Sequence, residues 1–207
     1  MDFIPIWEVL SPDECLPLVI GARDSSNGGR IGGMPPRGVR PPEVLAATHY
    51  FATVAISRRP ALELSLFTSL DPWGSSEVEG HGVLYDERSK LVQFVIHAPS
   101  PRLSRSSLRA AFSGHALKTL AKRDDPPFEV AARTSHKIGG FPYFYDQRFT
   151  ERWQAVIAKG FLPALQFTFP SGNDPGLPSG NFPFFNSMLN IFSKRTPRGL
   201  AFRYMFA

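Results

Sequence analysis

Few residues of this 207-residue chain have the types and spacing that chemistry requires. Its histidines are scattered, and no two of them stand in an H-x-x-x-H or H-E-x-x-H arrangement. The single cysteine, Cys15, excludes an internal disulfide and a cysteine-cluster metal site. The sequence therefore predicts no bound metal. The five histidines are His49, His81, His97, His115 and His136.

Nucleophilic and acid–base catalysis also lack a recognisable pattern. Cys15 would need a histidine brought close by the fold. His136 would need an oriented carboxylate, for which Asp146 is a candidate by proximity in the sequence. There is no G-x-S-x-G elbow, and the acid pair Asp124 and Asp125 precedes two prolines, where capping or turn roles are the default. We therefore expect structural histidines, an inert thiol, no catalytic residues and no cofactor.

A pattern of basic residue, Ile, Gly, Gly, any residue and Pro occurs twice, at Arg30–Pro35 and Lys137–Pro142. The amides of a Gly-Gly pair beside a basic side chain can form an anion-binding nest, although the spacing matches neither a P-loop nor a dinucleotide fingerprint. The alternative is structural, because glycines allow positive φ and close backbone approach and a proline rigidifies the exit. We favour the structural role. The predicted turn residues are Gly32, Gly33, Pro35, Gly139, Gly140 and Pro142.

The Gly-Gly pattern belongs to a longer internal similarity. The segment PALELSLF at Pro60–Phe67 is echoed by PALQFTF at Pro163–Phe169, and each follows its Gly-Gly pattern by a similar number of residues. Self-similarity of this kind indicates a duplication. We predict two degenerate repeats, about residues 28–97 and 135–206, which share one core in a single domain spanning 1–207.

Short elements must position these turns, because the chain contains 20 prolines and 17 glycines. Alternating apolar and β-branched runs predict strands, whereas apolar stripes with capping residues predict helices. The result is an α+β fold of mainly antiparallel strands with a few helices. Predicted helices are Arg102–Arg123 and Thr150–Lys159, the latter capped by Thr150 and Gly160, with a further helix start at Ser11. Predicted strands are Thr48–Ser57, Ala61–Ser69, Leu162–Phe169, Phe202–Phe206 and a hairpin of Gly82–Tyr85 with Lys90–His97.

The segment HKIGGFPYFYDQ, followed by LPALQFTFPS and GNFPFF, resembles the YwqG-like family, a bacterial domain of unknown function. Lys137–Pro142, Leu165–Phe167 and Gly180–Phe182 match that family's later turn, strand and Gly-Asn-Phe segment, and Arg30–Pro35 matches its early turn. The resemblance implies an α+β fold with two intertwined structural repeats. The chain departs from the family where an acidic Trp-Gly-Asp-like segment often precedes Gly-Asn, because NDPGLPSGN contains no Trp.

Some members of that family resemble immunity proteins encoded beside secreted bacterial toxins. The resemblance therefore implies a non-enzymatic protein-binding module, with a cognate toxin as its partner. Two segments with aromatic side chains, Asp71–Gly82 and Pro170–Phe185, are the expected contact loops, since aromatic residues are enriched in binding hot spots. Alternatively, their rings fill the edge of the core. The partner-binding candidates are Trp73, Glu77, Glu79, Asn181, Phe182 and Phe184, with Phe185 beside them.

A basic segment supports a second interpretation. The formal net charge is +5, and Arg102–Arg123 contains six Lys or Arg residues and no acid. An arginine-rich helix can follow phosphates, so nucleic-acid or anion binding through the predicted helix 102–123 is the alternative function. Few aromatic residues interleave with these charges, however, and a solvated basic face explains them more simply. We therefore expect no nucleic-acid partner.

The N-terminal segment indicates where the chain resides. Asp2 and Glu8 stand where a signal peptide would have a basic region. No apolar run is long enough to span a membrane. We therefore expect a cytoplasmic protein with no membrane partner.

Overall fold

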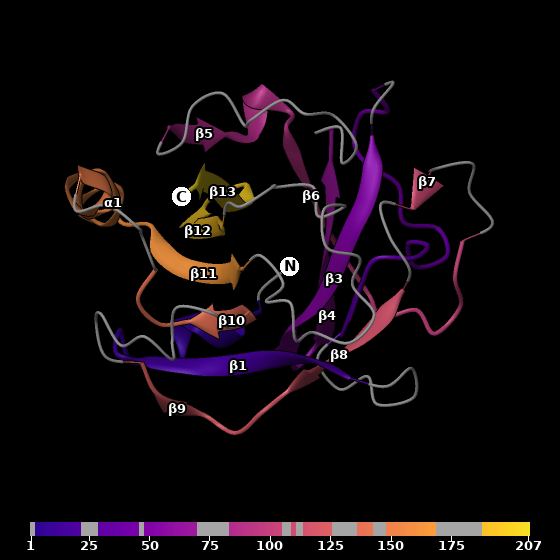
Figure 1. Ribbon diagram of the computed structural model, residues 1–207, viewed down its shortest axis with the longest axis horizontal. Helices are drawn as coiled ribbons and strands as arrows, with labels where there is room; N and C mark the ends of the chain where they lie inside the picture. Colours follow the sequence, from indigo (N-terminus) through magenta and orange to yellow (C-terminus); the bar gives the residue numbers. More distant parts are fainter. Residues whose placement is uncertain are drawn as a thin grey trace.

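Short strands make up most of the structure, a computed structural model that describes residues 3–21, 29–45, 48–69, 83–104, 109–110, 114–125, 136–142, 148–168 and 188–207 (Figure 1). The described helices are η1 (Ile6–Glu8), η2 (Glu87–Ser89) and α1 (Arg148–Ala158). The described strands are β1 (Glu14–Gly21), β2 (Gly29–Ile31), β3 (His49–Arg58), β4 (Ala61–Thr68), β5 (Leu84–Asp86), β6 (Val92–His97), β7 (Arg109–Ala110), β8 (His115–Thr119), β9 (Arg123–Asp124), β10 (His136–Gly139), β11 (Leu162–Phe167), β12 (Leu189–Thr196) and β13 (Gly199–Phe206).

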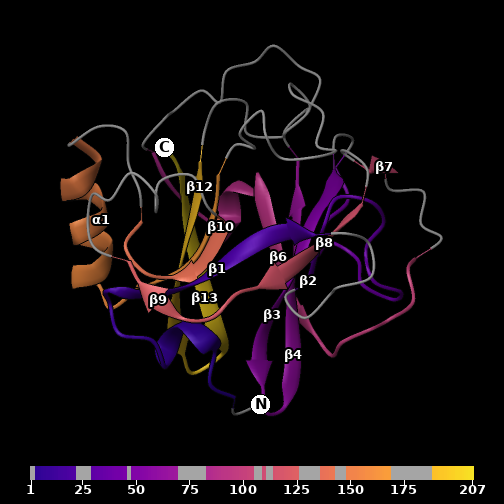
Figure 2. The ribbon, with the colours of Figure 1, turned by 60° about the horizontal axis from the view of Figure 1, so that its bottom comes forward.

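The strands form one mostly antiparallel sheet with the order β5-β13-β12-β11-β10-β1-β8-β2-β3-β4-β6. At its side, β9 pairs with β1, and β7 runs parallel to β3. The sheet curls into a half-barrel, so that the arm of β11, β12 and β13 faces the arm of β3, β4 and β6 across β1 and β8 (Figures 1 and 2). This arrangement agrees with the predicted α+β class of mainly antiparallel strands.

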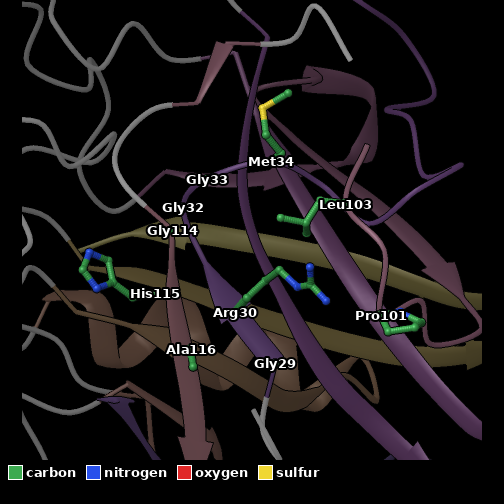
Figure 3. Close-up of a pocket in the computed structure, with 10 residues that line it drawn as sticks. All are labelled: Gly29, Arg30, Gly32, Gly33, Met34, Pro101, Leu103, Gly114, His115 and Ala116. Carbon is green, nitrogen blue, oxygen red and sulfur yellow. The ribbon is translucent and has the colours of Figure 1, made fainter. Parts of the chain in front are cut away.

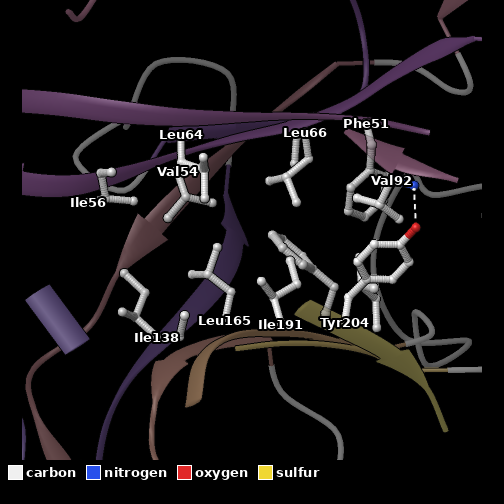
Figure 4. Packing of buried hydrophobic residues seen from close by; sticks show 14 of the residues in the cluster. Phe51, Val54, Ile56, Leu64, Leu66, Val92, Ile138, Leu165, Ile191 and Tyr204 are labelled. Atoms are coloured by element: carbon white, nitrogen blue, oxygen red, sulfur yellow. Dashed lines mark hydrogen bonds between the residues drawn. The ribbon is translucent and has the colours of Figure 1, made fainter. Parts of the chain in front are cut away.

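The main core lies between the two arms of the half-barrel. Figure 4 shows apolar side chains of β3 and β4, such as Val54 and Leu66, pointing toward Leu165 and Ile191 from the opposite arm. The rings of Phe51 and Phe167 meet edge to face with centroids 5.0 Å apart. Each fully buried side chain of this size contributes roughly 1.5–3 kcal/mol, and this contact between arms fixes the curl of the sheet.

Helix α1 covers the outer face of the arm formed by β11, β12 and β13 (Figures 1 and 2). Its buried Val156 packs with Phe161, Phe192 and Met205. The helix ends in a Schellman motif, because the Gly160 amide donates to the Ile157 carbonyl and the Phe161 amide donates to the Val156 carbonyl. Gly160 has φ +80° and therefore ends the helix as predicted, whereas Thr150 lies inside the helix rather than at its N-cap.

The predicted strands at Thr48–Ser57, Ala61–Ser69, Leu162–Phe169 and Phe202–Phe206 correspond to β3, β4, β11 and β13. The predicted hairpin is wrong in its pairing. Strand β5 pairs with β13 and β6 pairs with β4, so these two strands belong to opposite arms of the sheet. The Tyr204 hydroxyl of β13 accepts the Val92 amide at 3.1 Å and helps to close the two arms over η2 (Figure 4).

The predicted helix Arg102–Arg123 is wrong. Its described residues contain β7, β8 and β9, so His115 also lies on a strand rather than on a helix. Five residues between 104 and 114 are Ser or Gly, which lower helix propensity. In addition, β8 pairs with both β1 and β2, and this pairing outweighs the local apolar spacing.

The predicted helix start at Ser11 is wrong as well. The Ser11 carbonyl accepts the Glu14 amide, and the Glu14 side chain accepts the Ser11 amide at 3.0 Å, as in a capping box. The chain then enters strand β1 at Glu14 instead of a helix. The local capping signal is therefore real, but it closes a turn before a strand that pairs with β10 and β8.

Candidate binding site at the first Gly-Gly turn

The second Gly-Gly turn, at the end of β10, encloses a buried ion pair. Lys137 Nζ donates to Asp125 Oδ2 at 2.5 Å, and the two side chains are only 2% and 0% exposed. The same Asp125 oxygen accepts the Phe141 amide at 2.9 Å, while Lys137 also donates to the Phe141 carbonyl. The turn therefore binds a carboxylate of its own chain with one cation and one backbone amide.

Both glycines of this turn have left-handed backbone conformations, with φ +70° at Gly139 and +75° at Gly140. A β-carbon at Gly140 would lie 2.0 Å from Asp125 Oδ2 and 2.9 Å from the β-carbon of Cys15. The space beside Gly140 is therefore occupied by the carboxylate, and only glycine leaves room for it.

The first Gly-Gly turn, at the end of β2, has nearly the same backbone. Gly32 and Gly33 each have φ +68°, and the Gly32 amide donates to the Phe51 carbonyl at 2.7 Å. A β-carbon at Gly33 would lie 2.9 Å from the α-carbon of Gly114. Close backbone approach to β8 therefore requires glycine here too. Pro35 and Pro142 follow the two turns, and the Pro35 carbonyl accepts the Ser104 amide at 2.8 Å.

An open pocket of about 520 Å³ lies beside the first turn (Figure 3). The segment 101–104 forms one wall, because the Arg102 carbonyl accepts the Arg37 amide and Leu103 bridges to Pro36. Arg30 enters the pocket from β2, and its guanidinium points toward Leu103 in Figure 3. The lining residues are Gly29, Arg30, Gly32, Gly33, Met34, Pro101, Leu103, Gly114, His115 and Ala116.

The pocket combines one cation with an apolar rim. Arg30 donates to the Ser100 carbonyl at 3.2 Å through one guanidinium nitrogen and is only partly buried. No aspartate or glutamate lines the pocket among the described residues. Because a guanidinium has five N–H donors in a planar fork, Arg30 can also bind a planar anion. The site is therefore suited to recognising an anionic group.

A hydrogen-bonded chain runs across the sheet beyond the pocket. The Tyr50 hydroxyl donates to Thr53 at 2.7 Å, Thr53 and Ser65 Oγ are 2.6 Å apart, and Ser65 Oγ lies 2.8 Å from His97 Nε2. The other ring nitrogen of His97 lies 2.8 Å from the Ala98 carbonyl and can only donate to it. Ser65 therefore donates to His97, and the hydrogen bonds donate in one consistent direction from Tyr50 to Ala98.

This row of hydrogen-bonded side chains contains the residue types of a Ser-His-acid triad but not its geometry. His97 Nδ1 faces a backbone carbonyl, and Glu63 Oε2 stays 3.8 Å away from it. Ser65 is fully buried, so its hydroxyl cannot reach a substrate. We assign these hydrogen-bonded side chains a structural role, which is to link β3, β4 and β6.

Two other reactive groups are also buried. Burial lowers the pKa of His136 to about 4, and its Nδ1 accepts the Thr168 amide at 3.2 Å. Burial raises the pKa of the Cys15 thiol, and the nearby Asp125 carboxylate raises it further. At neutral pH, His136 is therefore a neutral imidazole and Cys15 a protonated thiol, and both are enclosed by the protein. Asp146, the predicted partner of His136, lies outside the described residues.

The predicted partner-binding residues Trp73, Glu77, Glu79, Asn181, Phe182, Phe184 and Phe185 all lie outside the described residues. The structure instead brings together Arg30, the first turn and Gly114. Sequence reasoning missed Gly114 and Asp125, because neither stands near its turn in the chain. The acid pair before two prolines was the available signal for Asp125, and it gave no indication of which residue the carboxylate would meet.

Comparisons with known proteins add no relative. No family model, no curated protein and no solved structure matches this chain. Within the described part of the chain, no group of three or more His, Cys, Asp and Glu side chains is arranged to hold a metal ion. Among the same residues, no helix is long and apolar enough to cross a membrane.

Proposed function

We propose that this chain is a non-enzymatic protein-binding module, which acts as a cytoplasmic immunity protein by binding a bacterial secreted toxin directly. The resemblance of its two Gly-Gly segments to the YwqG-like family supports the toxin as partner. The observation that carries the binding function is the open pocket at the first turn, where Arg30 lies beside the apolar Met34, Pro101 and Leu103. A central cation with an apolar rim fits a side chain projecting from a partner surface.

We also infer that the fold consists of two intertwined repeats within one domain spanning 1–207. The paths β2-β3-β4-β6 and β10-β11-β12-β13 are both antiparallel, and each has a Gly-Gly turn at the end of its first strand. In the chain β1 precedes β2 yet pairs with β10, while β8 precedes β10 yet pairs with β2. Such an exchange would make each half depend on the other, which supports one cooperative folding unit.

The contact surface in this proposal includes the segments Asp71–Gly82 and Pro170–Phe185. Their anchors would be the aromatic residues Trp73, Phe182 and Phe184, because truncating buried aromatic side chains has the largest effect in interfaces. Glu77, Glu79 and Asn181 would supply polar contacts at the rim.

The alternative is nucleic-acid binding through a basic helix at 102–123. The described residues of this segment form strands instead of that helix. Lys118 on β8 and Arg123 on β9 each pair with a residue of β1. The described cations of this segment are therefore not gathered on one helical face. We retain phosphate binding only as an outcome that the experiment must distinguish.

The test is calorimetric titration of the purified chain with the purified product of the adjacent gene and, separately, with random duplex DNA, at low and at moderate salt. We expect a saturable 1:1 complex with the protein that persists at moderate salt. DNA binding should be weak and should disappear as salt rises, because phosphate contacts release counterions. Tight DNA binding at moderate salt, without affinity for the neighbouring protein, would overturn the proposal.

A further inference from the structure

The two Gly-Gly turns are held in the same strand register. In the second turn, Ile138 pairs with Leu16 and Lys137 pairs with Pro17 on β1. In the first turn, Ile31 pairs with His115 and Arg30 pairs with Ala116 on β8. Arg30 therefore corresponds to Lys137. By the same register, Gly114 corresponds to Cys15, and these are the residues that approach Gly33 and Gly140 respectively.

The second turn shows which group this arrangement binds. The Asp125 carboxylate lies where a side chain on Gly140 would begin, and it accepts from the lysine and from the Phe141 amide. A nest of this kind favours an anion, because the amide and the ammonium both present positive charge to one oxygen.

The first turn presents the corresponding donors to the pocket. Arg30 replaces the lysine, and Met34 stands at the position of Phe141. Within the described residues, the Met34 amide has no acceptor, and Gly114 alone lies within 4 Å of the position that a β-carbon of Gly33 would take. Gly114 has no side chain at the position where Cys15 has one in the second turn, so its backbone approaches the first turn.

We propose that the pocket at the first turn binds a carboxylate, held by the Arg30 guanidinium and the Met34 amide in the way that Lys137 and the Phe141 amide hold Asp125. The change from lysine to arginine fits this assignment, because a guanidinium binds the two oxygens of a carboxylate side by side. Arg30 has one carbonyl partner at 3.2 Å, which leaves other N–H donors for a ligand.

The source of the carboxylate follows from the shape of the site. The pocket is open and its rim includes Met34 and Leu103, so an aspartate or glutamate side chain projecting from a protein loop fits it. This second step rests on the proposed binding function, whereas recognition of a carboxylate does not. A free small carboxylate would use the same donors, and the experiment separates the two sources.

The first measurement is an NMR titration of the ¹⁵N-labelled full chain with N-acetyl-aspartate N-methylamide, whose only charge is its side-chain carboxylate. We expect shifts concentrated at the amides of Gly32, Gly33 and Met34 and at the Arg30 side chain. The neutral control, N-acetyl-asparagine N-methylamide, should bind at least about tenfold more weakly. This is the factor in affinity that one charge-assisted hydrogen bond represents.

The variant Arg30→Gln tests the assigned cation, with Arg198→Gln as its matched control. Arg198 is exposed in the turn between β12 and β13, far from the pocket in sequence and on another arm of the sheet. Arg30→Gln should weaken the aspartate probe at least about tenfold, while Arg198→Gln should bind like the parent. Preserved dispersion of the NMR spectrum would show that each variant is folded.

Three outcomes would overturn or restrict the proposal in distinguishable ways. Equal shifts from the asparagine probe, or unchanged binding by Arg30→Gln, would refute carboxylate recognition. Stronger binding of inorganic phosphate at the same amides would replace the carboxylate by a phosphate. Acetate that binds as well as the aspartate probe, combined with no affinity for the neighbouring gene product, would retain the carboxylate site but refute the partner's side chain and the proposed function.

Discussion

The turn at Gly139 and Gly140 holds its lysine against a carboxylate of the same chain, whereas the turn at Gly32 and Gly33 presents its arginine to an open pocket. The backbones agree within a few degrees of φ, from +68° to +75°. The difference lies in what the surrounding strands supply. Beside the second turn the chain provides Asp125, and beside the first turn it provides Gly114 and the wall at 101–104.

This comparison separates a stabilising use of the motif from a binding use. A buried ion pair costs desolvation of both charges, so its partners become indispensable to each other. A partly buried arginine that keeps some contact with solvent costs less and remains able to bind another molecule. The same local sequence pattern can therefore serve stability at one place and recognition at another.

The largest expected effect is on Lys137. Replacing Lys137 by Met leaves the Asp125 carboxylate buried without its cation, and we expect the free energy of unfolding to fall by about 3–5 kcal/mol. Urea denaturation followed by tryptophan fluorescence measures this loss. The double variant Lys137→Met with Asp125→Leu should recover much of it, because apolar side chains can replace a buried pair. A single variant as stable as the parent would show that the pair is not needed by the fold.

The free energy of unfolding should depend on pH through the strand that precedes the second turn, because only that strand has a histidine at the position in question. His136 precedes Lys137 on β10, and Gly29 holds the corresponding place on β2. Burial lowers the pKa of His136 to about 4 in the folded chain, below the value of about 6.5 expected after unfolding. Because the unfolded chain binds more protons between these values, stability should be full above pH 6.5 and should fall by about 3 kcal/mol as the pH drops toward 4.

The control for this effect is His136→Gln, which retains a polar acceptor for the Thr168 amide but does not titrate. Its free energy of unfolding, measured in urea at several pH values, should depend less on pH between 6.5 and 4 than that of the parent. An identical slope in both proteins would assign the acid sensitivity to other groups.

A smaller effect should separate strain from crowding at the glycines. Gly140 and Gly38 both have positive φ, but nothing lies within 4 Å of a β-carbon built on Gly38. Gly38→Ala should therefore show only the cost of a left-handed alanine, while Gly140→Ala must also displace the Asp125 carboxylate. We expect Gly140→Ala to lose about 1–3 kcal/mol more than Gly38→Ala in urea denaturation. Equal losses would mean that Asp125 moves aside freely.

Much of the fold could be predicted from local pattern. The runs at Thr48–Ser57 and Ala61–Ser69 alternate in part between apolar and polar residues, and they form β3 and β4. The Gly-Gly pairs predicted backbone conformations with positive φ, because few other residues tolerate them. Helix α1 carried both an apolar stripe and a glycine stop. In each case the signal itself lies within a few residues along the chain.

The rest depended on contacts between distant segments. The apolar spacing of Arg102–Arg123 suggested a helix, yet β8 is fixed by partners on β1 and β2. The strands β5 and β6 are close in sequence but complete opposite arms of the sheet. The role of Asp125 required its meeting with Lys137, and the pocket required Gly114 to reach Gly33. No local pattern encodes such meetings.

The smallest expected effect on stability belongs to Arg30 and is the sharpest test of the comparison. Its described hydrogen bond is to the Ser100 carbonyl, in a partly exposed setting. Arg30→Gln should therefore change the free energy of unfolding by less than about 1 kcal/mol, although the corresponding residue Lys137 is expected to be essential. Urea denaturation of both variants under the same conditions makes the contrast direct. A loss at Arg30 as large as that at Lys137 would mean that the arginine holds a carboxylate of its own chain. The first turn would then stabilise the fold as the second does, and its arginine would not be available to a ligand.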